Sequence, residues 1–292
     1  MSKVWLITGT SRGLGRDLAD AVLGSGDRLI ATARNPAQLA DLAAKYGDRV
    51  RAVALDVTNA ASARAAVASA VTSFGRLDVV VNNAGYANVC SIEDADDADF
   101  RAQVETNFFG VANVTRAALP VLRAQGSGHV IQISSIGGRL GSAGLAAYQS
   151  SKWAVEGFSE VLAREVTPLG IRVTIVEPGG FRTDWAGSSM RVDPYNAAYE
   201  PTIGTINAYR GKQDAAHGDP AKAAQAILKL AALEQPPLRL LLGSDAVFLA
   251  KTVGAARVAE DEKWRALSLS TDFDGVPDFA ETPFAKMLSK RN

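Results

Sequence analysis

The chain has 292 residues, of which 47% are hydrophobic and 21% are charged, and its formal net charge is +0. This ordinary globular composition argues against disorder, and the absence of a basic stripe argues against nucleic acid as a partner. Cys90 is the only cysteine, which rules out an intrachain disulfide and fits a reducing compartment. The apolar run Val4–Ile7 is too short for a signal peptide or a membrane span, so we expect a cytoplasmic protein without a membrane partner.

Short apolar runs alternate along the chain with longer Ala-rich segments. In chain order, the expected strands are Val4–Thr8, Leu29–Ala33, Arg51–Leu55, Val79–Asn82, Val130–Ser134, Val173–Glu177 and Leu238–Leu242. The expected helices are Gly13–Gly24, Pro36–Lys45, Ala60–Phe74, Asp99–Leu122, Ala146–Pro168, Asp219–Leu233 and Val247–Leu267. Apolar strands that alternate with helices are typical of a parallel sheet covered on both faces. The sequence therefore predicts a doubly wound α/β fold of Rossmann type, with a mostly parallel sheet of seven strands and helices on both faces.

This alternation breaks between Gly179 and Gly218, where Gly, Ser, Pro and aromatic residues follow no strong period. A long irregular stretch inside a compact domain is usually functional and often forms a lid. We predict one domain over residues 1–292, with a substrate lid at about 184–218 and an extended tail at about 244–292 that is coil from Ser268 on. The lid side chains expected to line an apolar pocket are Trp185, Met190, Tyr195, Tyr199 and Tyr209, facing Tyr86, Leu140 and Leu145.

The first expected strand runs into Thr8–Gly15, a segment with glycines at positions 9, 13 and 15, and a helix follows. Glycines let a phosphate approach the backbone, and the helix N-terminus supplies N–H groups and a positive dipole end. Simple helix-capping glycines are the alternative. The position in the first β-α unit favours a dinucleotide site.

The end of the second strand bears on the choice of cofactor. An acidic residue there would bind the adenosine ribose of NAD, but the chain has Ala33 followed by Arg34. A carboxylate repels a 2′-phosphate, whereas a guanidinium binds it, and Arg12 in the glycine loop adds a second cation. The sequence therefore favours NADP(H) over NAD(H). The alternative is that Arg34 lies free in solvent at a strand edge.

Tyr148 and Lys152 stand four residues apart in an expected helix, so their side chains share one face. A phenol has a pKa near 10, and a fixed neighbouring cation lowers that pKa. The pair is thus a candidate general acid/base. The alternative is an amphipathic helix with a solvated lysine.

Further segments accompany these motifs in chain order: Asp56-Val57, Asn82–Gly85, Asn107–Gly110, Ile133–Ser135 and Pro178–Thr183. With Thr8-Gly9-x-x-x-Gly13-x-Gly15 and Tyr148-x-x-x-Lys152, they resemble the short-chain dehydrogenase/reductase family over residues 3–185. The tail phrase Leu241–Ala246 resembles the branch near the steroid and retinol dehydrogenases.

This resemblance implies a catalytic tetrad of Asn107, Ser135, Tyr148 and Lys152. Tyr148 would be the general acid/base, Lys152 would lower its pKa and bind the nicotinamide ribose, Ser135 would bond the substrate oxygen, and Asn107 would hold a water. The implied cofactor-binding residues are Gly9, Ser11, Arg12, Gly13, Leu14, Gly15, Arg34, Asp56, Val57, Asn83, Ala84, Gly85, Tyr148, Lys152, Pro178, Gly179, Phe181 and Thr183.

The implied reaction is hydride transfer between NADP(H) and a ketone, aldehyde or secondary alcohol, and the apolar lid favours a hydrophobic substrate. The resemblance also implies a homodimer or homotetramer formed by the helices of Asn107 and Tyr148, although the tail leaves a monomer open. No metal site is expected, because the two histidines and one cysteine lack ligand spacing.

Two other classes of function stay open. A cofactor-binding sensor or scaffold without turnover would be expected to lose Tyr148 or Lys152, and both are present. A serine hydrolase would use Ser11, because Gly9–Gly13 matches Gly-x-Ser-x-Gly, with His129 or His217 as its base.

Overall fold

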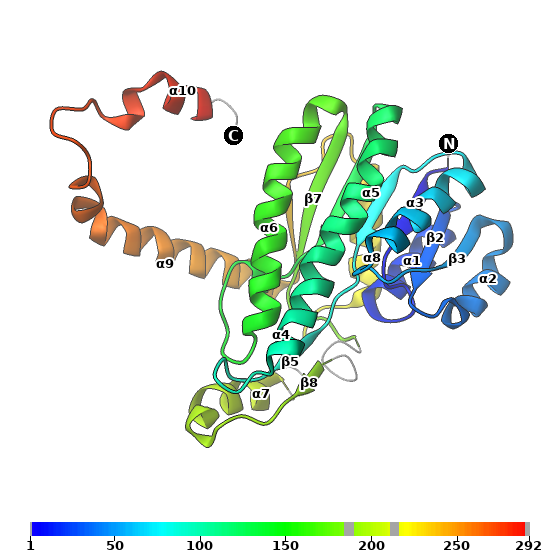
Figure 1. Cartoon of the computed structure of the whole chain (residues 1–292), viewed down its shortest axis with the longest axis horizontal. Coiled ribbons are helices and arrows are strands. Elements are labelled where there is room, and N and C mark those ends of the chain that lie inside the picture. The colour runs from blue at the N-terminus through cyan, green and yellow to red at the C-terminus, as the bar shows by residue number, and fades with distance from the viewer. Residues whose placement is uncertain (1, 184–189, 211–215, 290–292) are drawn as a thin grey trace. The chain divides into compact units, whose positions relative to one another are not determined.

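The computed structural model describes residues 2–183, 190–210 and 216–289. In this part of the chain, seven strands form one sheet in the order β3-β2-β1-β4-β6-β7-β9, and every neighbouring pair is parallel (Figure 1). The strands are β1 (Val4–Ile7), β2 (Arg28–Ala33), β3 (Val50–Ala54), β4 (Val79–Asn82), β6 (Gly128–Ile133), β7 (Ile171–Pro178) and β9 (Arg239–Leu242). The predicted doubly wound α/β fold is confirmed.

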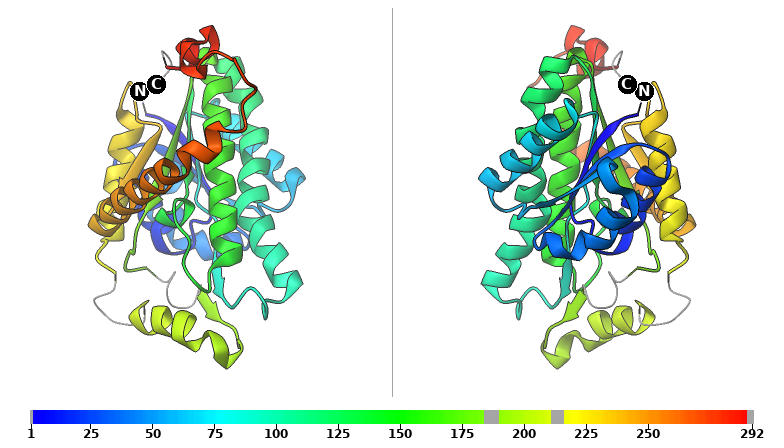
Figure 2. Two further views of the ribbon diagram at one scale, coloured as in Figure 1. Left: turned by 90° about the vertical axis from the view of Figure 1, so that its left-hand side faces the viewer. Right: turned by 90° about the vertical axis from the view of Figure 1, so that its right-hand side faces the viewer.

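Helices cover both faces of this sheet (Figures 1 and 2). On one face lie α1 (Gly13–Gly24), α2 (Ala40–Tyr46) and α8 (Pro220–Ala232). On the other lie α3 (Ala60–Phe74), α5 (Gly110–Gln125) and α6 (Ala146–Val166). Strand β1 serves both cores, because successive side chains of a strand point to opposite faces. Trp5 and Ile7 pack in the first core, while Val4 and Leu6 pack in the second.

The order of the strands places a switch point of the chain between β1 and β4. The chain runs from β1 outward to β2 and β3, then returns to place β4 on the other side of β1. In open parallel sheets, ligands bind beyond the carboxyl ends of the strands at such a switch point. The segments that follow Ile7, Ala33, Asn82, Ile133 and Pro178 therefore meet at one edge of the sheet.

The predicted helix Asp99–Leu122 is interrupted in the structure. Helix α4 (Asp97–Val104) passes into a π-helical turn, η3 (Glu105–Phe109), before α5 begins. A π turn accommodates one additional residue and is frequent at functional sites. Here it holds Asn107, whose side chain is fully buried.

The expectation of an irregular stretch between Gly179 and Gly218 is wrong for its described residues. Strand β8 (Met190–Val192) pairs in parallel with β5 (Ala87–Val89), and the turns η7 (Ala197–Tyr199) and η8 (Glu200–Gly204) precede α7 (Thr205–Arg210). These elements are too short for a hydrophobic period to reveal them. Trp185 lies outside the described residues.

Backbone contacts divide the chain into two compact units, residues 1–250 and 251–292. Helix α9 (Ser244–Leu269) begins in the first, and the second also contains η9 (Phe279–Glu281) and α10 (Pro283–Ser289). The prediction of coil from Ser268 on is therefore wrong. Helix α10 starts with proline at its first position, and the Thr282 hydroxyl caps it by accepting the Ala285 N–H at 3.2 Å.

The remaining short helical turns are η1 (Pro36–Leu39), η2 (Gly47–Arg49), η4 (Ile136–Gly138) and η5 (Thr167–Leu169). Within the described ranges, none of the helices combines the length and the apolar character that crossing a bilayer requires.

Candidate active site

The glycine loop between β1 and α1 turns tightly, and Gly9 and Gly15 are crowded by neighbouring atoms. Gly9 and Gly13 have φ angles of +71° and +57°, a region that favours glycine. A Cβ at Gly15 would collide with the Gly9 carbonyl oxygen and the Asn83 amide. The sequence predicts that a phosphate binds here, at the N-terminus of α1.

Thr8 and Asn83 join this loop to the end of β4. The Thr8 hydroxyl accepts the backbone N–H groups of Asn83 and Ala84, each at 2.9 Å. In return, the Asn83 amide donates to the carbonyl oxygens of Thr8 at 2.9 Å and Gly9 at 3.2 Å. Thr8 was not among the predicted site residues, although a hydroxyl residue directly before the first loop glycine is a usable signal.

A hollow of about 480 Å³ lies beside the loop, lined by Gly13, Asp17, Arg182, Thr183 and Pro220. It connects the start of α1 with the segment that follows β7. A Cβ on Gly13 would lie 3.8 Å from the Thr183 Cβ, so the two segments face each other closely.

The segment after β7 is held in place by the end of β9 and the start of α9. Gly179 N–H donates to the Leu242 carbonyl oxygen at 2.9 Å, and Gly180 N–H donates to the Asp245 carboxylate at 2.6 Å. Phe181 forms an isolated β-bridge with Gly218 and packs on the first core. Asp245 is a supporting residue that the sequence analysis did not select.

The predicted adenosine-side residues lie at the ends of β2 and β3 and at the start of α1. Arg34 follows the last residue of β2, and both Arg34 and the α1 cap residue Arg12 are exposed. The exposed Asp56 carboxylate accepts the Thr58 N–H at 3.0 Å, while Val57 is buried in the second core. Ser11 is half-buried at the loop. Leu14 packs on the first core.

Tyr148 and Lys152 are both buried in the first two turns of α6. The Lys152 Nζ lies 5.7 Å from the centre of the Tyr148 ring. It also donates a hydrogen bond to the Ile133 carbonyl oxygen at 2.8 Å. Burial lowers the pKa of Lys152 to about 8. The ammonium is therefore still mostly charged at neutral pH, beside the phenol.

Asn107 and Lys152 meet at Gly85. A Cβ on Gly85 would lie 2.9 Å from the Asn107 Oδ1 and 3.6 Å from the Lys152 Nζ. The Asn107 amide is fixed by the Tyr86 backbone, since its Oδ1 accepts the Tyr86 N–H at 3.0 Å and its Nδ2 donates to the Tyr86 carbonyl at 2.9 Å. Three of the four predicted catalytic residues thus gather around the end of β4.

Ser135 lies just beyond the end of β6. Its Oγ accepts the Gly137 N–H at 3.0 Å and donates to the Pro178 carbonyl oxygen at 3.5 Å. It lies two residues after Ile133, whose carbonyl binds Lys152. The fourth predicted residue is therefore tied to the same helix through its own strand.

One side of Tyr148 is apolar. It packs in a cluster with Ala87, Val89, Leu145 and Ile203, and Met190, Tyr195 and Tyr199 pack against that cluster. Ile203 comes from the predicted lid and is buried. Tyr209, by contrast, is 58% exposed and does not join the predicted pocket wall.

His129 cannot assist Ser11. It lies at the start of β6, paired with Val79 at the start of β4, whereas Ser11 lies beyond the carboxyl end of β1. Its Nε2 lies 3.0 Å from the Thr174 hydroxyl, and burial lowers its pKa to about 3. His129 is therefore a neutral structural residue near the amino ends of the strands, away from the glycine loop.

Comparison with known proteins identifies the family of the chain. The sequence model of a family described as short chain dehydrogenase matches residues 3–192. The chain belongs to this family. This short-chain dehydrogenase is 53% identical over 273 residues to an oxidoreductase of Botryotinia fuckeliana, in a match that covers 93% of the chain and 100% of the relative.

Solved structures of short-chain dehydrogenases share its fold. The enzyme from Streptomyces avermitilis has a TM-score of 0.88 and 44% identity, with 94% of this chain and 100% of that chain covered. A short-chain dehydrogenase from Burkholderia cenocepacia J2315 in complex with NADP has a TM-score of 0.71 and 28% identity, with 90% and 97% covered. The predicted family is confirmed, and the protein is an oxidoreductase of that family.

Proposed function

We propose that the protein is an NADP(H)-dependent carbonyl reductase or alcohol dehydrogenase, with Tyr148 as its general acid/base. The observation that carries this proposal is the burial of Tyr148 and Lys152 together on one face of α6, beside Asn107. In reduction, the Tyr148 hydroxyl donates a proton to the carbonyl oxygen, and in oxidation the phenolate accepts one. When bound, the nicotinamide supplies or accepts the hydride.

The other three residues support that proton transfer. The Lys152 ammonium favours the phenolate form of Tyr148 and can bond ribose hydroxyls of the cofactor. Ser135 directs its hydroxyl at the substrate oxygen, where negative charge develops in the transition state. Asn107, fixed to the Tyr86 backbone, holds a water that connects Lys152 to solvent.

The site suits a dinucleotide. The glycine loop would meet the diphosphate at the N-terminus of α1, and Lys152 would bond the ribose. The exposed Arg12 and Arg34 would bind a 2′-phosphate near the end of β2, where the sequence has Ala33 and no carboxylate. The NADP complex of the Burkholderia relative agrees with this choice.

Cofactor preference is tested by exchanging charges at β2. Ala33→Asp with Arg34→Leu introduces an acceptor for the ribose hydroxyls and removes a cation for the 2′-phosphate. We expect the ratio of kcat/KM for NADPH to that for NADH to fall by about 10²-fold or more, from the loss of one charged contact and a new repulsion. Arg101→Leu, an arginine change on α4, is the control, and an unchanged ratio in the double variant rejects the assignment.

An apolar ketone, aldehyde or secondary alcohol fits the site best. The apolar cluster at Tyr148 includes Leu145 from the body and Ile203 from the predicted lid, with Met190 packed beside them. The Arg191 guanidinium pairs with Asp99 at 3.1 Å, so β8 is tied to α4 by charge as well as by its pairing with β5. The proposed lid, residues 184–218, would close this apolar wall over the substrate.

The decisive experiment compares Tyr148→Phe with the unchanged protein. NADPH oxidation is followed against a panel of aryl, aliphatic and steroid ketones and aldehydes. Removal of the hydroxyl should lower turnover by about 10²–10⁴-fold while NADPH still binds, because a positioned proton donor is lost. Near-normal turnover removes Tyr148 from the mechanism. Tight NADPH binding without turnover of any panel compound favours a sensor, and labelling of Ser11 by a phosphonate probe favours a hydrolase.

The assembly and location are part of the same proposal. Exposed apolar side chains occur on the two helices expected to pair, with Phe109 at 46% exposed in η3 and Val161 at 55% in α6. Such residues favour association of copies. A homodimer or homotetramer remains our prediction, with a monomer as the alternative. A cytoplasmic location is proposed from the sequence alone.

A further inference from the structure

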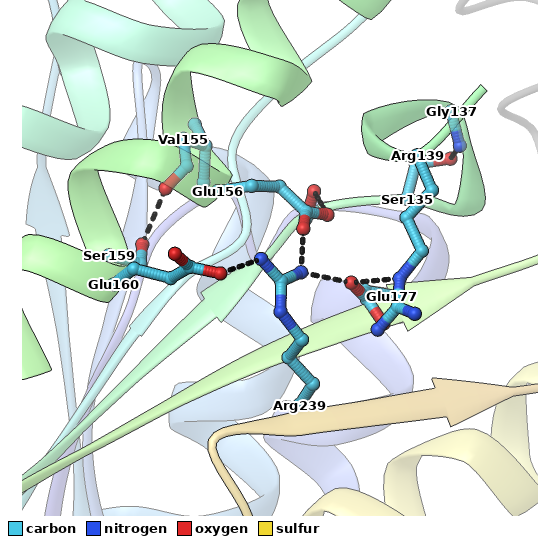
Figure 3. Close-up of polar contacts among 10 residues, drawn as sticks. Ser135, Gly137, Arg139, Val155, Glu156, Ser159, Glu160, Glu177 and Arg239 are labelled. Atoms are coloured by element: carbon cyan, nitrogen blue, oxygen red, sulfur yellow. Dashed lines mark hydrogen bonds and ion pairs between the residues drawn. The ribbon is translucent and has the colours of Figure 1, made fainter. Parts of the chain in front are cut away.

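Two arginines and three glutamates form a network of ion pairs near Ser135 (Figure 3). Arg139, which follows η4, binds Glu177 of β7 through two bonds, Nε to Oε1 at 2.8 Å and Nη2 to Oε2 at 2.6 Å. Arg239 of β9 reaches the same Glu177 Oε1 at 2.6 Å. It also pairs with Glu156 and, at 2.6 Å, with Glu160 on α6. Four separate parts of the fold are thus linked.

The centre of this network is removed from water. The Glu177 side chain is 0% exposed and that of Glu156 is 6% exposed. Burial raises the pKa of Glu177, and the Arg139 guanidinium opposes that shift. Desolvation makes buried ion pairs weak contributors to stability, but their directional bonds define one geometry. The network is therefore better suited to fixing positions than to raising stability.

The Arg139–Glu177 pair acts on the two backbone groups that bond Ser135. Ser135 Oγ accepts the N–H of Gly137, which stands two residues before Arg139. The same Oγ donates to the carbonyl oxygen of Pro178, the residue directly after Glu177. The Gly137 N–H and the Pro178 carbonyl, which both bond the Ser135 hydroxyl, therefore each lie within two residues of a member of this bidentate ion pair.

Glu156 fixes the same loop against α6. It lies one turn beyond Lys152 on the face that carries Tyr148. Its carboxylate accepts the Ser134 hydroxyl at 2.7 Å, and a Cβ on Gly138 would collide with it. Because Lys152 binds the Ile133 carbonyl, two successive turns of α6 hold the two residues that precede Ser135.

We propose that Arg139 and Glu177 are positioning residues that aim the Ser135 hydroxyl at the substrate oxygen. This inference rests on the proposed function. At 3.5 Å the bond from Ser135 Oγ to Pro178 is long and weak, so the proton can turn to a substrate oxygen while the Gly137 N–H keeps the oxygen atom in place. A displacement of about 1 Å at such a group can cost about 10²-fold in rate.

A double-mutant cycle between Arg139→Met and Ser135→Ala tests this dependence. Arg139→Met should lower kcat by about 10–100-fold, while the Kd for NADPH changes by less than about 2-fold, because Arg139 is not one of the proposed cofactor contacts. In the Ser135→Ala background, the same substitution should lower kcat by less than about 3-fold, since no hydroxyl remains to be positioned. The measurements use NADPH and the panel ketone with the highest kcat/KM.

Arg76→Met provides the matched control. Arg76 pairs with Asp78 at 2.6 Å, next to the amino end of β4, and its loss should leave kcat unchanged. Arg139→Lys keeps the charge but not the bidentate geometry, so its kcat should lie between those of the unchanged protein and Arg139→Met. If Arg139→Met fails to fold, as judged by circular dichroism and NADPH binding, the cycle run with Arg139→Lys decides.

Three results overturn the inference. They are equal losses of kcat in both backgrounds, a kcat of Arg139→Met that matches Arg76→Met, and a Ser135→Ala variant with normal turnover. Loss of turnover in Tyr148→Phe alongside a normal Arg139→Met rejects this inference alone. Normal turnover in Tyr148→Phe instead rejects the proposed function.

Discussion

Lys152 combines a buried position with a charge that the proposed chemistry needs. Its ammonium donates to the Ile133 carbonyl and lies beside Tyr148, and burial lowers its pKa to about 8. Below that pH the cation favours ionisation of the phenol, whereas above it the neutral amine exerts no such effect. Burial thus brings the titration of Lys152 close to physiological pH.

The pH dependence of carbonyl reduction should reveal this titration. Reduction requires that the Tyr148–Lys152 pair hold its proton, so kcat/KM should fall as the pH rises through about 8. The apparent pKa of that fall belongs to the pair rather than to either residue. In Lys152→Arg the guanidinium stays charged at every pH of the assay, and the falling limb of its residual activity should move upward, away from the pKa of Lys152. A limb that stays in place would assign the titration to another group.

At the scale of elements, the joint between β1 and β4 holds the glycine loop in place. A single hydroxyl, that of Thr8, accepts two backbone N–H groups from the segment that follows β4. Thr8 itself is 1% exposed, so water does not easily replace its oxygen. The two strands that flank the switch point therefore depend on one side chain at their carboxyl ends.

Thr8→Val keeps the shape of the side chain but removes this acceptor. We expect the free energy of unfolding to fall by about 2 kcal/mol, because the N–H groups of Asn83 and Ala84 lose their partner in a partly buried place. Thr8→Ser keeps the hydroxyl and should lose about 1 kcal/mol or less, for one methyl group. Urea unfolding measures both, and a Thr8→Val variant as stable as the unchanged protein would show that the hydroxyl does not hold the joint.

Element length explains which parts of the fold can be predicted. The strands of the main sheet are short apolar runs followed by turn residues, so a local pattern reveals each of them. Strands β5 and β8 have three residues each, too few for a local pattern to reveal them. They form by pairing with each other across a long stretch of chain, with Ala87 opposite Met190. The π turn at Asn107 likewise has no local signal, since it forms where the amide binds the Tyr86 backbone.

The candidate site likewise contains residues that the sequence predicts and supporting residues that it does not. Helical spacing predicts Tyr148 and Lys152 as a pair, whereas Asn107 and Ser135 are predicted only through the family resemblance. The residues that support them belong to no motif. Arg139 and Glu177 stand 38 positions apart, and their contact depends on the parallel pairing of β6 with β7. A glutamate inside an apolar strand is nevertheless a signal, because a buried carboxylate needs a partner.

At the scale of the whole molecule, the two units differ in how far their apolar side chains are buried. Throughout the described part of the chain, the buried apolar residues end with Ala246, and the three hydrophobic clusters lie within residues 1–250. The second unit, residues 251–292, exposes large apolar side chains instead, with Phe273 at 88% and Val258 at 70% exposed. The residues of the three hydrophobic clusters therefore all belong to the first unit.

A chain that ends at Ala250 should consequently keep the properties of the core. It retains Asp245, which holds the Gly180 N–H at the candidate site. We expect Tm to change by less than about 4 °C, equivalent to about 1 kcal/mol, and NADPH affinity by less than about 2-fold.

Light scattering should find the same assembly as in the full chain, whereas Val161→Arg in the full chain should dissociate it by burying a charge between helices. A larger fall in Tm would mean that the tail packs on the core. A truncated monomer would mean that residues 251–292 carry the contact between copies.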